Sequence, residues 1–174
     1  KILVLGFICF LQSILFITTL SIHFELPAEG LIFSNVLLEY IIHYFLISFS
    51  ACMIGLAVSG FVKKQEFTLI IAIIYMIVQL IFSGILLKIE GIAQNISNVI
   101  VGKYAINIMG ATSNLIEVVK HTKLNGVLPE QVSIDLFLQE ATNFFEYTKS
   151  HIINTWWLLL AMALFFILLT FIVI

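Results

Sequence analysis

Residues 67–87, FTLIIAIIYMIVQLIFSGILL, form an apolar run of 21 residues without a charged side chain. As a helix this run would extend about 31 Å, the thickness of the hydrocarbon core of a bilayer. Hydrophobic residues make up 61% of the chain and charged residues 10%, whereas soluble domains have about 45–50% and 25%. A soluble core of this size cannot bury so much apolar surface, so the sequence predicts an all-α polytopic membrane protein.

Four apolar runs reach or approach the roughly 20 residues that a spanning helix needs. They cover residues 2–22, 40–62, 67–87 and 156–174. We therefore expect four transmembrane helices. A longer segment, residues 88–155, separates the third run from the fourth.

The charge pattern predicts the orientation of these helices. Residues 63–66 form the short turn KKQE, and paired lysines in a short loop mark the cytoplasmic side. Four alternating spans then place both ends of the chain in the cytoplasm and residues 88–155 outside. Trp156 and Trp157 would open the last span at the outer interface, where indole rings prefer to lie.

The outer segment is too apolar in residues 91–119 for a solvated loop and too interrupted for a span. We expect short re-entrant helices that dip into the outer leaflet and carry Lys103, Tyr104 and Asn107, covered there by other spans. Residues 130–149 have apolar side chains at helical spacing and predict an amphipathic helix at the outer surface.

Two sets of residues inside the spans are candidates for a functional role. Gln79 and Ser83 share one helical face, which either lines a transport path or holds helices together by hydrogen bonds. The second set is a stripe of small residues at spacing four, Ala51, Gly55 and Ser59, which is typical of close helix packing.

Other polar residues give weaker signals. Glu39 and His43 are four residues apart and could bind a metal or relay a proton, but we interpret them as an interfacial pair in contact with water. We interpret Cys9 and Cys52, both inside apolar runs, as small buried hydrophobes rather than as a disulfide or metal pair. The sequence therefore predicts no metal site.

The sequence gives no indication of an enzymatic or a nucleic-acid-binding function. It contains no phosphate-binding loop and no nucleophile–base arrangement, so we expect this segment not to be an enzyme by itself. A net charge of −2, with 8 Lys and no Arg, gives no indication of nucleic acid as a partner. Because the chain begins with Lys1 rather than Met, we interpret it as a segment of a longer polypeptide.

Three stretches resemble the membrane domain of type-two ABC exporters, in particular the G-subfamily-like permeases. GLAVSGFVKKQEF (55–67) resembles the family's small-residue helix end and charged turn, and VQLIFSGILLKIEGI (78–92) resembles its Q-x-x-F-S-G stretch. GKYAINIMG (102–110) is similar to the segment that follows that helix, with Lys-Tyr where the family often has Arg-Trp. The chain would then be a partial permease domain, residues 1–174, containing the family's last four helices.

The resemblance implies a function and several partners. The family works as a dimer of two permease halves and exports its substrate by alternating access. The apolar and aromatic residues of this chain, among them 16 Phe, favour a hydrophobic or amphipathic substrate. ATP and magnesium would bind an associated nucleotide-binding domain, upstream on the same polypeptide, so this segment would hold no cofactor. Gln79, Phe82, Ser83 and Gly84 would lie near the substrate path or its gate. The absence of a cysteine pair in the outer segment favours a bacterial inner membrane.

A second hypothesis explains the spans equally well. The chain could be a non-transporting anchoring, sensor or assembly subunit whose outer segment binds a partner. A phosphate-binding loop upstream of Lys1 would favour the exporter, and a soluble sensor or enzyme domain would favour the alternative.

Overall fold

The computed structural model describes the chain in seven parts: residues 1–23, 26–27, 30–62, 65–83, 91–113, 145 and 148–173. All the regular elements in these parts are α-helices, as predicted. They are α1 (Ile2–His23), α2 (Val36–Phe61), α3 (Gln65–Phe82), α4 (Ile92–Ser97), α5 (Val101–Thr112) and α8 (Lys149–Val173).

Three of these helices, α1, α2 and α8, are long and apolar enough to cross a membrane, and they indicate an integral membrane protein. The predicted fourth span corresponds to α3, whose apolar part in the described residues, Glu66–Phe82, is shorter. The count of four spans is therefore not confirmed, since part of the predicted run 67–87 lies outside the described residues.

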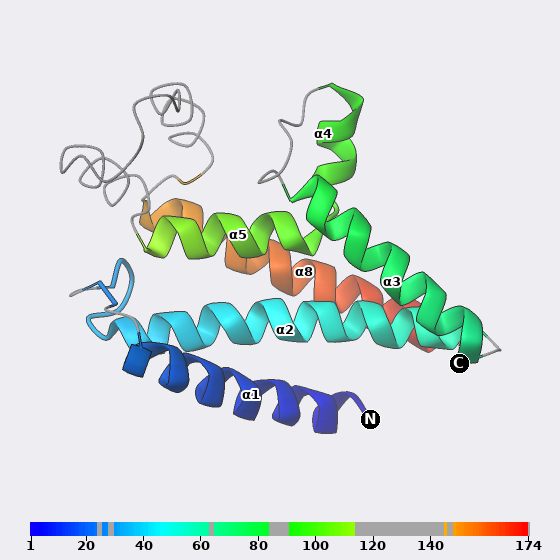
Figure 1. Cartoon of the computed structure of the whole chain (residues 1–174), viewed down its shortest axis with the longest axis horizontal. Coiled ribbons are helices and arrows are strands. Elements are labelled where there is room, and N and C mark those ends of the chain that lie inside the picture. The colour runs from blue at the N-terminus through cyan, green and yellow to red at the C-terminus, as the bar shows by residue number, and fades with distance from the viewer. Residues whose placement is uncertain are drawn as a thin grey trace.

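Helix α2 lies at the centre of the bundle, between α1 and α8 (Figure 1). Its buried side chains recur every three or four residues along the whole helix, which is the spacing of a helix packed on its neighbours. They are Val36, Glu39, Tyr40, His43, Leu46, Ser50, Met53, Ile54 and Ala57. Because these positions cover a wide part of its surface, α2 packs against α1, α5 and α8 at once.

Two helix starts differ from the predicted spans. Helix α2 begins four residues before the predicted position 40, because the side chain of Asn35 accepts a hydrogen bond from the Leu37 backbone N–H at 3.0 Å and caps the helix. Helix α8 begins at Lys149 rather than at Trp156. The first residues of this helix are mostly polar, so the predicted apolar run does not include them. Ile152, which lies in this stretch, is nevertheless fully buried.

Helix α5 returns to the bundle after the C-terminal end of α3 (Figure 1). It contacts α2, α3 and α8, and α4 contacts α3. Within residues 91–113, short helices are present as α4 and α5, whereas their entry into the outer leaflet stays a prediction. The predicted amphipathic helix, residues 130–149, falls largely outside the described residues.

The two ends of the chain lie at the same end of the bundle, where α2 ends and α3 begins (Figure 1). This arrangement agrees with the expected placement of both ends on one side of the membrane together with the KKQE turn. The identity of that side stays a prediction from the charge pattern.

The two cysteines are free. Cys9 of α1 is buried as predicted, whereas Cys52 of α2 is only half-buried, and the two side chains lie near each other. This proximity was not predicted, because nothing in the spacing of two distant cysteines indicates which helices will be neighbours.

We expect mild oxidation with copper phenanthroline to join Cys9 and Cys52 within one chain, since facing thiols can form a disulfide when their Cβ atoms are about 3.5–4.5 Å apart. The measurement is the loss of labelling of both thiols by a maleimide mass tag after oxidation. Cys9→Ser and Cys52→Ser are the controls. Full tagging of the oxidised wild-type protein would contradict the placement of Cys9 next to Cys52.

Candidate functional site

Several polar side chains of the described residues lie where α5 meets its neighbours. Helix α5 contacts α2, α3 and α8. Some of the residues that the sequence singled out lie at these contacts, and the others do not.

At the α3–α5 contact, Gln79 lies against Gly102. A Cβ atom placed on Gly102 would be 3.3 Å from the Gln79 carbonyl oxygen, which is tighter than an ordinary contact. Gly102 therefore allows the two backbones to approach closely. The half-buried Gln79 side chain lies near the hydroxyl of Tyr75, which is four residues earlier on the same helix.

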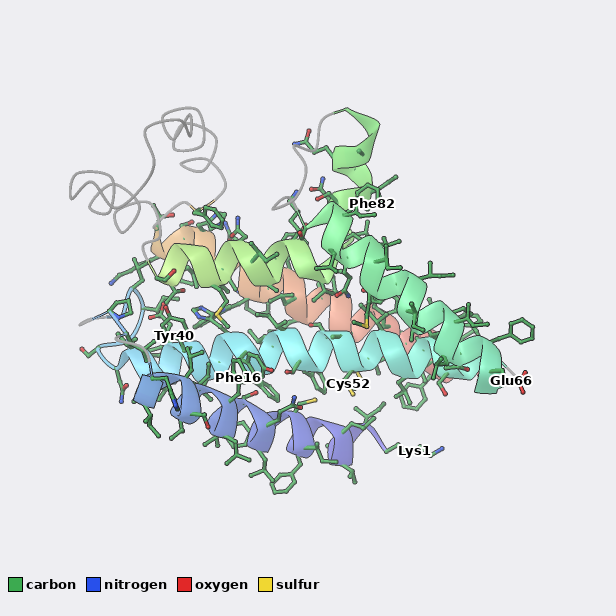
Figure 2. The ribbon with its side chains drawn as sticks, viewed as in Figure 1. Lys1, Phe16, Tyr40, Cys52, Glu66 and Phe82 are labelled. Atoms are coloured by element: carbon green, nitrogen blue, oxygen red, sulfur yellow. The ribbon has the colours of Figure 1, made fainter. Side chains whose placement is uncertain are left out.

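The end of α3 is tied to α4. The Ser83 hydroxyl is buried and donates to the Leu80 carbonyl oxygen, three residues earlier in the chain, at 2.7 Å. The Ser97 hydroxyl donates to the Phe82 carbonyl oxygen at 2.9 Å. Figure 2 shows Phe82 at this end of α3, beside α4. Gly84 lies outside the described residues.

The turn between α4 and α5 is held by Asn98. Its side-chain oxygen accepts from the Lys103 ammonium at 2.7 Å, and its carbonyl oxygen accepts from the Tyr104 hydroxyl at 2.7 Å. Partial burial lowers the pKa of Lys103 and raises the pKa of Tyr104. These two residues of the predicted re-entrant segment therefore brace its first turn.

Asn107, the third residue predicted for that segment, joins α5 to α8. Its side-chain oxygen lies 2.5 Å from Nε2 of His151, and Asn107 is buried. Deeper in the bundle, the Ser50 hydroxyl of α2 donates to the Leu159 carbonyl oxygen of α8 at 2.9 Å. Polar groups thus connect α8 to both of its neighbours.

The interpretation of Glu39 and His43 as a water-exposed pair is wrong. Both side chains have an exposed fraction of 0%. Oε2 of Glu39 accepts from the backbone N–H groups of Ile32 and Phe33, at 3.0 and 3.4 Å. Nδ1 of His43 lies 3.4 Å from the Thr112 hydroxyl. Their spacing of four residues predicts a shared face but not the helices that cover it.

The close approach of residues 30–33 to Glu39 depends on Gly30. A Cβ atom at this position would lie 2.7 Å from Oε2 of Glu39 and would overlap the Phe33 carbonyl oxygen. The absence of a side chain at Gly30 therefore lets this loop fold over the start of α2. Sequence reasoning missed this loop, in which a glycine precedes the Asn35 cap.

The predicted packing stripe of Ala51, Gly55 and Ser59 is exposed, and a Cβ atom on Gly55 would meet nothing within 4 Å. Within the part of the chain that the structure describes, α2 uses another face for α8. No group of three or more His, Cys, Asp or Glu side chains is arranged for a metal among the described residues.

Comparisons with models of protein families, with characterised proteins and with solved structures found no match to this chain. The chemistry and geometry of its own residues are therefore the basis for a proposed function.

Proposed function

We propose that this chain is the membrane-spanning permease part of an ATP-driven ABC exporter, which moves a hydrophobic or amphipathic substrate outward by alternating access. The observation that carries this proposal is the return of α5 onto the bundle, where it contacts α2, α3 and α8. A simple membrane anchor needs no such helix. In a transporter, a helix at this position would transmit movement of α3 to the other spans.

In this proposal α3 also spans the membrane, which makes four spanning helices together with α1, α2 and α8. Helices α4 and α5 form a re-entrant hairpin on the outer side. Gln79 and Phe82 would lie near the path or its gate, since both are at the part of α3 that meets this hairpin. The close contact at Gly102 would couple rigid-body movement of α3 to α5.

The proposal also names partners. A nucleotide-binding domain upstream on the same polypeptide would bind ATP and magnesium on the cytoplasmic side. A second permease half would complete the path, and the exposed stripe of Ala51, Gly55 and Ser59 supports such a homodimer, because small residues permit close helix approach. The expected location is a bacterial inner membrane with both ends of this segment in the cytoplasm.

The test is ATP-dependent transport by the full-length polypeptide that contains this segment, reconstituted in proteoliposomes with a fluorescent amphipathic cation or phospholipid as the probe. We expect ATP hydrolysis that the probe stimulates, together with vectorial movement of the probe. A polypeptide without an ATP-binding domain or an ATP-binding partner would contradict the proposal and favour an anchoring or sensor subunit.

A further inference from the structure

Three polar atoms in the first part of α2 and of α8 are buried and have no hydrogen-bond partner among the described residues. They are Oε1 of Glu39, Nε2 of His43 and Nε1 of Trp156. Burial of a polar group without a partner is costly, so three such atoms on neighbouring residues favour a ligand that satisfies them.

The neighbouring hydrogen bonds determine what each atom offers. The Thr112 hydroxyl donates its single proton to the Ile108 carbonyl oxygen at 2.9 Å, so it can only accept from Nδ1 of His43 at 3.4 Å. A neutral imidazole that donates from Nδ1 has an acceptor at Nε2. Oε1 of the Glu39 carboxylate is also an acceptor, and the indole N–H of Trp156 is a donor.

Ring contacts and one hydrogen bond link the three residues through Phe33 and Trp156. The ring of Phe33 stacks on that of Trp156 with centroids 6.2 Å apart, and the backbone N–H of Phe33 donates to Glu39. The rings of His43 and Trp156 have centroids 5.4 Å apart. Glu39 and His43 are four residues apart on α2 and so share a face.

We infer that Glu39, His43 and Trp156 form a binding site for one internal water molecule. A water molecule donates two hydrogen bonds and accepts at least one, which matches two acceptors and one donor. Buried waters typically make about three such bonds to otherwise unsatisfied groups. A metal cation does not fit, because the N–H group of Trp156 is a donor and cannot coordinate a metal. An ammonium ion does not fit either, because it has no lone pair to accept a hydrogen bond from the Trp156 N–H.

The bound water would connect four parts of the fold. Through Glu39 it joins the loop of residues 30–33, through His43 it joins α2 and the end of α5, and through Trp156 it joins α8. The site would therefore fix the position of the loop over the outer end of the bundle, and this role does not depend on the transport proposal.

The test is a water-edited solid-state NMR spectrum of the full-length protein, labelled with ¹⁵N-tryptophan, in lipid bilayers. We expect a cross-peak between water and the Trp156 indole N–H, assigned by its loss in Trp156→Phe and its persistence in Trp157→Phe. Trp157, the matched control, has an exposed fraction of 69% and belongs to no such cluster.

In His43→Leu, which replaces one acceptor by an apolar group, the Trp156 cross-peak should be lost while the signal of Trp157 is unchanged. Absence of the cross-peak from the wild-type spectrum would overturn the inference even if the variant does not fold. A Trp156 cross-peak that persists at full intensity in folded His43→Leu would also overturn it, because the water would then be bound elsewhere.

Discussion

Replacing Leu159 by alanine is expected to destabilise the folded bundle by about 2 kcal/mol, or about thirtyfold in the folding equilibrium. Leu159 is fully buried and packs in one cluster with Leu46, Ile54 and Val101. The substitution leaves a cavity where three helices meet. The expected loss is at the low end for buried leucines, because lipid is as apolar as the interior and only the packing contribution remains.

The matched control is Leu160→Ala, at the next position of α8. Leu160 has an exposed fraction of 36%, so its truncation should change the free energy of unfolding by less than about 0.5 kcal/mol. Unfolding in mixed micelles of increasing sodium dodecyl sulfate measures both values. Equal losses for the two variants would show that Leu159 does not face the core of the bundle.

The helical class could be predicted because long apolar runs have few alternatives in lipid, where the backbone must satisfy its own hydrogen bonds. The ends of the helices were harder to predict. Helix α2 starts at its Asn35 cap and α8 starts among polar residues. A prediction based on apolar length stops where the apolar run stops, whereas the helix continues as long as its backbone bonds are made.

The buried polar cluster could not be predicted from local patterns. Glu39 and His43 are typical of a water-facing helix end, and only the tertiary packing of α5, α8 and the loop of residues 30–33 covers them. The stripe of Ala51, Gly55 and Ser59 shows the opposite case. It has the composition of a packed face but is exposed within the described part of the chain.

The substitution Gln79→Leu should reduce the transport rate of the reconstituted full-length protein by about tenfold while the protein stays folded. Gln79 is half-buried where α3 meets α5, and its backbone lies against Gly102. Leucine has a similar size but no hydrogen-bonding group, and the loss of one such bond in a membrane costs about 0.6–2 kcal/mol. If the transition state alone loses about 1.4 kcal/mol of stabilisation, the rate falls about tenfold.

Two further variants separate a role in transport from a role in packing. Gln12→Leu makes the same change at an exposed position of α1 and should leave transport unchanged. Tyr75→Phe removes the hydroxyl that lies near Gln79 but keeps the amide. If Gln79 contacts the substrate, Tyr75→Phe retains most of the activity, because the amide is still present in the path. If Gln79 only holds the helix together through Tyr75, the two variants lose activity and stability equally, and the assignment of this face to the path is then wrong.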